Sequence, residues 1–324
     1  MPRLDLDGLV AEAQPGETVL AALLRSGAVV RHSCRAGACQ SCLLRVTEGT
    51  PSPQGQQGLK DTLRERGYIL SCITPADRDL RLSAVDSDGL QTLATLQESA
   101  LLSPTVLRLR LRPQQPLPYR AGQFIQILRD DGLTRSYSLA SVPSIDPDLE
   151  LHIRVLPDGR MSGWLATLRP GQALRLRGPA GDCFYTPGNP SQPLLLVGTG
   201  TGLAPLWGIA RDALSQGHTG PLVLVHGARS PTGLYYQNQL LQLAQTHPAL
   251  TYLPCVLEDG PPSVPGLVVG AIEHVLRERF PKLAGWRVFL CGDPPMVQAL
   301  RRQVFLAGAG RRDIFADAFV PSAS

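Results

Sequence analysis

The run HSCRAGACQSC, residues 32–42, carries three of the cysteines that organise this 324-residue chain. Cys34, Cys39 and Cys42 follow the spacing C-x4-C-x2-C, and Cys72 comes after 29 intervening residues, in the segment YILSC. Four thiolates at this spacing hold two irons in plant-type [2Fe–2S] centres. The pattern therefore predicts a one-electron carrier at the front of the chain, with these four cysteines as its metal ligands.

Zinc and disulfide bonding are the alternative uses of these cysteines. Structural zinc sites favour two close cysteine pairs, whereas here three ligands share one loop and the fourth is distant. The cysteines are odd in number, seven, and residues 1–10 lack the basic and apolar regions of a signal peptide. We therefore predict a cytoplasmic protein, because clustered thiols in a reducing compartment bind metal rather than pair.

Composition argues against two classes of partner. The net charge is only +4, lysine occurs only at Lys60 and Lys282, and no run of basic residues stands out. This is not the footprint of a nucleic-acid-binding protein. The longest apolar runs have the length of strands and are too short to cross a bilayer, so we expect no membrane span.

Periodicity divides the chain into three predicted domains, which give a multidomain protein of α+β and α/β class. Residues 1–88 alternate turns, a short helix and short strands, as in a β-grasp [2Fe–2S] ferredoxin domain. Residues 96–190 alternate apolar and polar side chains, which predicts an antiparallel β-barrel with one helix at about residues 162–168. In residues 191–324, apolar runs alternate with helix-like segments, which predicts a parallel sheet covered on both faces.

The segment RSYS, residues 135–138, lies on a strand of the predicted barrel. By itself it reads as a polar edge strand. After the cysteines and before the α/β segment, it resembles the R-x-Y-S motif of the ferredoxin–NAD(P) reductase superfamily. The resemblance implies that Arg135 pairs with a flavin phosphate and that Tyr137 lies on the isoalloxazine ring. It also implies that Ser136 belongs to this flavin-binding strand and that Ser138 forms a hydrogen bond near the flavin N5.

A second flavin segment is GRMS, residues 159–162. By resemblance, Gly159 frees the backbone, and Ser162 starts a helix whose N–H groups meet a pyrophosphate. Met161, in the same segment, is also a predicted cofactor-binding residue. The alternative is an ordinary capped helix. On the preceding strand, the backbone from His152 and the side chain of Arg154 would contact the adenosine half, although a solvent-facing arginine is the other interpretation. These features favour FAD over FMN.

The run GTGTGLAP, residues 198–205, follows an apolar strand and opens a helix. It departs from the G-x-G-x-x-G fingerprint because position 203 is leucine. It resembles instead the G-x-G-x-G-x-A-P loop of the same superfamily, in which glycines let a dinucleotide approach the helix N-terminus. The predicted NAD(P)-binding residues in this loop are Gly198, Thr199, Gly200, Thr201 and Gly202.

The segment CGDPPM, residues 291–296, follows another apolar strand and resembles the superfamily's C-G-x-P-x-M segment at the nicotinamide end. Cys291 would border the site of hydride transfer at the carboxyl edge of the sheet, as a neighbour and not a nucleophile; a small buried cysteine is the alternative. Phe319, in the tail IFADAF, would cover the flavin face, unless it is a core residue. Ser138, Cys291 and Phe319 are thus the predicted catalytic residues, and Cys291, Gly292, Asp293, Pro294 and Phe319 are also predicted to bind cofactor.

The segment RSPTGLY, residues 229–235, follows the second apolar strand, where the adenine ribose is expected. NADH-preferring relatives often carry an acidic residue near position 233, but this chain has Gly233, with Arg229 nearby. The discriminator against NADPH is missing at that position. Arg229 is a predicted nucleotide contact, and we expect NADH as the donor, with NADPH open.

The resemblance covers essentially the whole chain, which is similar to reductase components of bacterial multicomponent oxygenases, especially those of the naphthalene-dioxygenase type. It implies that electrons pass from NAD(P)H through FAD and the cluster, one at a time, to an oxygenase component or its ferredoxin. The alternatives are a reductase for CDP-6-deoxyhexose synthesis, a free flavin or ferric reductase, and a redox sensor or scaffold without enzymatic activity.

Overall fold

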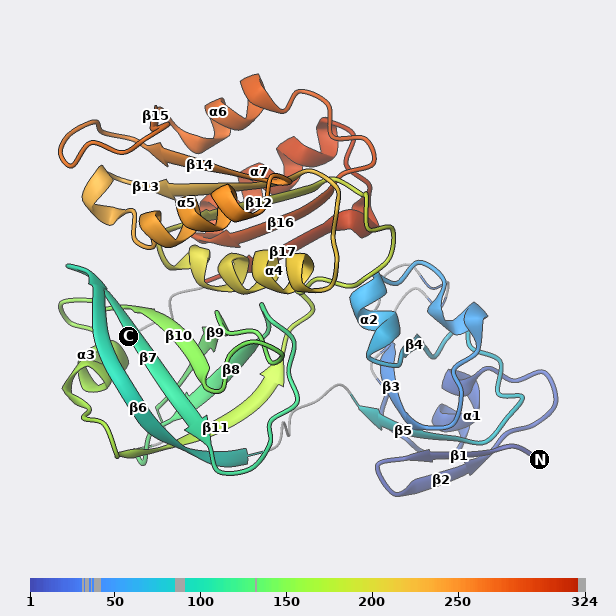
Figure 1. Ribbon diagram of the computed structural model, residues 1–324. Helices are drawn as coiled ribbons and strands as arrows, with labels where there is room; N and C mark the ends of the chain where they lie inside the picture. Colours follow the sequence, from blue (N-terminus) through green and yellow to red (C-terminus); the bar gives the residue numbers. More distant parts are fainter. Residues whose placement is uncertain are drawn as a thin grey trace. The chain divides into compact units, whose positions relative to one another are not determined.

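The computed structural model describes residues 1–30, 32, 35, 37, 42–84, 91–131 and 133–319. They form two compact units, Met1–Ser87 and Asp88–Ser324 (Figure 1). Within the described residues, every helix is too short or too polar to cross a membrane.

The first unit is a five-stranded mixed sheet with one main helix. The strand order is β2-β1-β5-β3-β4, and the β1–β5 pair is parallel. Thr18 caps helix α1 by accepting from the N–H of Ala21 at 3.2 Å, and Gly27, at φ +84°, follows its end. The elements are β1 (Arg3–Leu6), β2 (Leu9–Glu12), α1 (Val19–Arg25), β3 (Leu43–Glu48), η1 (Pro53–Gln56), α2 (Asp61–Glu65), β4 (Tyr68–Leu70) and β5 (Leu80–Ala84).

The second unit begins with a six-stranded antiparallel sheet of order β10-β7-β6-β11-β8-β9. A bridge between Leu139 and Leu151 joins its two edges, which closes the predicted barrel. The helix begins at Arg160, two residues earlier than expected, because extended Gly159 is its N-cap. The elements are β6 (Gln91–Ser103), β7 (Val106–Pro113), β8 (Phe124–Leu128), β9 (Thr134–Ser138), β10 (Leu149–Arg154), α3 (Arg160–Thr167) and β11 (Ala173–Ala180).

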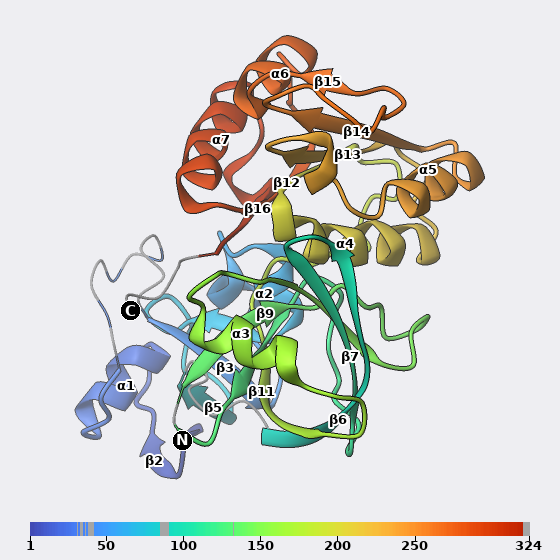
Figure 2. The ribbon, with the colours of Figure 1, turned by 90° about the vertical axis from the view of Figure 1, so that its left-hand side faces the viewer.

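The rest of this unit is the expected parallel sheet, of order β15-β14-β13-β12-β16-β17. Its central strands are buried on both faces, with α4 and α5 on one side and α6 and α7 on the other (Figure 2). The elements are β12 (Leu194–Thr199), η2 (Gly200–Gly202), α4 (Leu203–Ser215), β13 (Leu222–Ala228), η3 (Pro231–Gly233), α5 (Gln237–Thr246), β14 (Leu250–Val256), β15 (Val268–Val269), α6 (Ile272–Arg279), β16 (Arg287–Gly292), α7 (Pro294–Leu306), η4 (Arg311–Asp313) and β17 (Ile314–Ala318).

Helix α4 packs closely on the barrel as well as on the parallel sheet. A Cβ atom at Gly208 would lie 3.1 Å from the carbonyl oxygen of Ala140 and 3.2 Å from that of Leu139. On the barrel side, a Cβ at Gly122 would lie 2.7 Å from Ile209 of the same helix. Glycine at both positions therefore lets the two halves of the unit approach each other.

Candidate functional site

The described part of the predicted metal site lies at one end of the antiparallel pair of strands β3 and β4. Leu43 pairs with Leu70, so Cys42, just before β3, lies close to the end of β4, where Cys72 follows. Ser71 holds the carbonyl oxygen of Cys42 with its N–H at 3.2 Å and its hydroxyl at 2.8 Å. Both cysteine side chains are buried. Strand pairing thus brings together two predicted ligands that are 30 positions apart in sequence.

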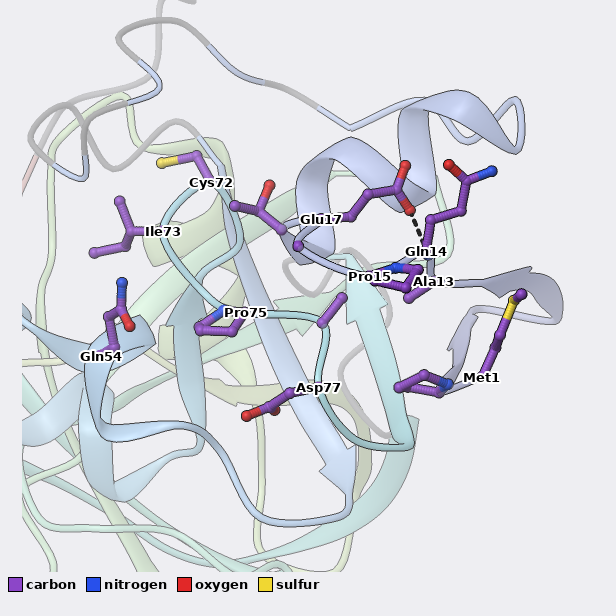
Figure 3. A pocket seen from close by; sticks show the side chains of 14 residues that line it. Met1, Ala13, Gln14, Pro15, Glu17, Gln54, Cys72, Ile73, Pro75 and Asp77 are labelled. Carbon is purple, nitrogen blue, oxygen red and sulfur yellow. Dashed lines mark hydrogen bonds between the residues drawn. The ribbon is translucent and has the colours of Figure 1, made fainter.

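The other two predicted ligands, Cys34 and Cys39, lie outside the described residues. Beside Cys72 there is a pocket of about 650 Å³. Figure 3 shows Cys72 and Ile73 at one end of this pocket, Met1 at the other, and Pro15 and Pro75 between them. The predicted cluster site therefore borders a surface hollow lined largely by apolar side chains.

The predicted flavin-binding strand is β9, at the edge of the barrel sheet next to β8. The guanidinium of Arg135 donates to the carbonyl oxygen of its neighbour Thr134 at 2.8 Å and has no acidic partner among the described residues. Ser136, next on the strand, is exposed. Burial raises the pKa of Tyr137, so its phenol stays protonated. A guanidinium beside a half-buried aromatic ring suits a phosphate followed by a flat ring.

The strand ends at a contact with the parallel sheet. The hydroxyl of Ser138 donates to the carboxylate of Asp317, on β17, at 3.1 Å. Burial raises the pKa of Asp317, an effect that the Ser138 hydrogen bond opposes and nearby Asp182 reinforces. Sequence reasoning missed Asp317, although it is the one carboxylate in the otherwise apolar tail IFADAF.

Cys291 and Phe319 lie in the same place. Cys291 is fully buried and pairs with Asp317 in the β16–β17 ladder. Its sulfur lies 3.8 Å from that of Cys183, and burial raises its pKa well above the ordinary value, so it is a neutral thiol. The N–H of half-buried Phe319 donates to the carbonyl oxygen of Gly292 at 2.8 Å. The fold thus gathers the three predicted catalytic residues; their roles stay predictions.

In the second flavin segment, the side chains of Met161 and Ser162 contact other parts of the barrel. The hydroxyl of Ser162 accepts from the N–H of Leu156 at 3.1 Å, and a Cβ at Gly159 would lie only 2.2 Å from it. Met161 is buried in the barrel core. The backbone N–H groups at the start of α3 are therefore what this segment offers to a cofactor. Arg154, by contrast, is exposed and has no ion pair among the described residues.

His152 has no free ring nitrogen. Its Nε2 lies 3.0 Å from a carboxylate oxygen of Glu150, and its Nδ1 lies 3.1 Å from the hydroxyl of Tyr235. Because a carboxylate only accepts, Nε2 carries the proton and Nδ1 accepts from the tyrosine. Burial lowers the pKa of His152, so the ring is neutral. Its backbone remains the part that can contact a cofactor, while its ring joins the barrel to the segment before α5.

The glycine loop lies where the strand order reverses, between β12 and β16. A Cβ at Gly202 would lie 2.2 Å from the carbonyl oxygen of Cys291, and one at Gly198 would lie 2.7 Å from Leu206. Gly200, at φ +53°, has open space around its Cβ position. The loop is thus pressed onto the sheet and open on one side, at the place where parallel sheets bind nucleotides. These residues fit a dinucleotide.

The remaining predicted nucleotide contacts border this loop. Gly292, at φ +130°, would place a Cβ 2.9 Å from the hydroxyl of Thr199. Asp293 is the N-cap residue of α7, and Pro294 begins that helix, a position that suits proline. Thr201 lies half-buried within η2. Arg229 does not reach this group but lies farther along the edge; its side chain is exposed and donates to Glu258 at 3.0 Å.

Comparisons with known proteins agree with this arrangement. Residues 4–77 match a 2Fe-2S iron-sulfur cluster binding domain, residues 94–185 an oxidoreductase FAD-binding domain and residues 196–302 an oxidoreductase NAD-binding domain. The chain is similar to the reductase component of the naphthalene 1,2-dioxygenase system of Pseudomonas putida, with 34% identity over 94% of each chain. It is also similar to the reductase subunit of an aromatic O-demethylase of Amycolatopsis, with 33% identity over 91% of this chain and 92% of that one.

A solved structure extends the likeness to three dimensions. The ferredoxin reductase in carbazole 1,9a-dioxygenase superimposes with a TM-score of 0.66 and 27% identity over 98% of both chains. The predicted fold class and the three cofactor-binding modules are therefore confirmed. The chain belongs to the family of iron–sulfur flavoprotein oxidoreductases that join a 2Fe–2S domain, an FAD-binding domain and an NAD-binding domain, the family of the reductase components of multicomponent oxygenases.

Proposed function

We propose that this chain is the reductase component of a multicomponent oxygenase. It takes electrons from NADH or NADPH and delivers them singly to the oxygenase or to a ferredoxin that serves it, as the names of its relatives suggest. The hydrogen bond between Ser138 and Asp317 carries the proposal, because it joins the flavin-binding strand to the carboxyl edge of the parallel sheet. Nucleotides bind at that edge in such sheets.

On the barrel side, each predicted residue has a definite task. FAD, when bound, supplies the exchange between a two-electron hydride and single electrons. Arg135 binds its phosphate, and Tyr137 supports its ring. The N–H groups of residues 160–162, the backbone at His152 and the side chain of Arg154 hold its far half. Ser136 contributes through the backbone of the same strand.

On the sheet side, the glycine loop 198–202 binds the pyrophosphate of the nicotinamide nucleotide. Cys291, a buried neutral thiol, and Phe319 exclude water from the reacting rings. Asp317 holds the hydroxyl of Ser138 in place. The backbone of residues 292–294 borders the same nucleotide site, next to Thr199.

In the first unit, Cys34, Cys39, Cys42 and Cys72 would hold the [2Fe–2S] cluster, which would supply one-electron transfer. Thiolate ligation needs reduced cysteines, which supports a cytoplasmic location. The pocket beside Cys72 offers a partner a surface next to one ligand.

Anaerobic titration with NADH and with NADPH tests the proposal. The purified protein should carry one FAD and two irons per chain, and its visible absorbance should bleach with at least one nucleotide. Cys39→Ser should abolish reduction of a protein acceptor but preserve reduction of ferricyanide, because hydride transfer to the flavin takes place before electrons reach the cluster. Cys255→Ser, at a cysteine outside the predicted sites, should preserve both activities. Absorbance that neither nucleotide changes would contradict the proposal.

A further inference from the structure

The ion pair between Arg229 and Glu258 lies at the edge of the parallel sheet where the adenine ribose is expected. Arg229 follows β13 directly, and Glu258 comes two residues after β14. The N–H of Leu257 donates to Ala228 at 3.3 Å, and the N–H of Glu258 donates to the carbonyl oxygen of Arg229 at 2.9 Å. The strand ladder thus continues into both loops and fixes their backbones side by side.

The same edge carries the glycine loop. Thr199, the last residue of β12, pairs with Gly227 of β13. A Cβ at Gly227 would lie 2.8 Å from the methyl group of Thr199, so the ends of the two strands are packed tightly. A dinucleotide that rests its pyrophosphate on the loop after β12 therefore directs its adenosine toward the ends of β13 and β14.

The pair itself is a surface pair. Nε of Arg229 lies 3.0 Å from Oε1 of Glu258, and the side chains are 81% and 60% exposed. Exposed ion pairs of this kind contribute little to folding stability. The pair acts locally. The guanidinium of Arg229 is bound to one oxygen of the Glu258 carboxylate, and the other oxygen of that carboxylate remains accessible to a ligand.

The chemistry of the ribose distinguishes the two donors. NADH presents a 2′-hydroxyl, which donates to a carboxylate, whereas NADPH presents a 2′-phosphate, which a carboxylate repels and an arginine attracts. Position 233 supplies no carboxylate, since it is Gly233 of η3. Glu258 supplies one from the next strand of the sheet and at the same time neutralises Arg229.

We propose that Glu258 sets a preference for NADH over NADPH by engaging Arg229 and by accepting a hydrogen bond from the adenine ribose. This inference rests on the proposed function, because it concerns the donor of the same reaction. It also gives Arg229, a predicted nucleotide contact, an acidic partner.

The test compares two substitutions that act in opposite directions. Glu258→Gln frees Arg229 and removes the repulsive charge, so the ratio of kcat/KM for NADPH to that for NADH should rise about tenfold or more. Arg229→Ala leaves the carboxylate unopposed, so the ratio should fall below that of the wild type. Glu278→Gln is the matched control, since Glu278 on α6 is 65% exposed and pairs with His274; it should leave the ratio unchanged.

Calorimetry with adenosine 2′,5′-bisphosphate and with AMP gives a readout that does not depend on electron transfer. Glu258→Gln should tighten binding of the bisphosphate but not of AMP. A wild type that prefers NADPH, or a ratio that Glu258→Gln changes less than twofold, overturns the inference while leaving the proposed function intact. Failure of both nucleotides to reduce the wild type overturns both.

Discussion

Glu150 is the centre of a buried polar network that joins the barrel to the parallel sheet, and its removal should destabilise the second unit. One carboxylate oxygen accepts from the hydroxyl of Tyr236 at 2.8 Å and from His152 at 3.0 Å. The other accepts from Arg110 at 3.1 Å. Burial alone would raise the pKa of Glu150, but these donors outweigh it and lower the pKa from 4.5 to about 2.

Glu150→Gln keeps the shape of the side chain but turns a donor toward Arg110 and removes the negative charge. Breaking a buried pair in this way costs about 3 kcal/mol of unfolding free energy. For a unit of this size the midpoint of thermal unfolding should fall by about 6–12 °C. Asp130→Asn is the control, because Asp130 is 95% exposed and pairs with Arg175 on the surface; its effect should stay below about 0.5 kcal/mol.

The pH dependence gives this prediction its sharpest test. The folded pKa of Glu150 is depressed, so its stabilisation is complete above pH 4.5 and is lost as the pH falls toward 2. His152, whose pKa burial lowers, adds a loss below its ordinary value, 6.5, because the unfolded chain binds the proton first. In urea unfolding, the difference between wild type and Glu150→Gln should therefore shrink from pH 7 to pH 3. Equal differences at both pH values, or a difference under about 1 kcal/mol at pH 7, would refute this reasoning.

Three further substitutions probe the site itself. Arg135→Ala should weaken FAD binding by about 10- to 100-fold, through loss of a charge-assisted phosphate contact, and the flavin content after dialysis would show it. Gly202→Val places a side chain against the carbonyl oxygen of Cys291, so KM for NADH should rise more than about tenfold at unchanged FAD content; an unchanged KM would contradict the tight loop. Asp317→Asn removes the carboxylate that Ser138 contacts and that would stabilise a positively charged nicotinamide, so stopped-flow flavin reduction should slow about tenfold. In the wild type that rate should fall as the pH drops through the raised pKa of Asp317, and a pH-independent rate would count against this role.

Features with a local cause were predictable from the sequence. Alternating apolar and polar side chains in β7 predicted a barrel, because its strands have one buried face. Continuous apolar runs in β12 and β13 predicted a parallel sheet, because its strands have two buried faces. The glycines at 198 and 202 were predictable for the same reason, since a dinucleotide loop needs a bare backbone. The predicted start of α3 was wrong by two residues. Gly159 has an extended backbone and is the N-cap residue, so the helix begins directly after it.

Features that depend on tertiary contacts were not predictable. In the sequence, no motif distinguishes Asp317 from other carboxylates. In the fold, the β16–β17 ladder places it beside Cys291, and the barrel places Ser138, 179 positions away in sequence, within hydrogen-bonding distance. Glu258 likewise becomes relevant to the nucleotide site only because β14 pairs with β13. This pairing places Glu258 beside Arg229, which directly follows β13. Both carboxylates come from strands next to the one that carries the recognisable motif. In a parallel sheet the residues that tune a nucleotide site can therefore belong to neighbouring strands, where a search confined to the motif would not find them.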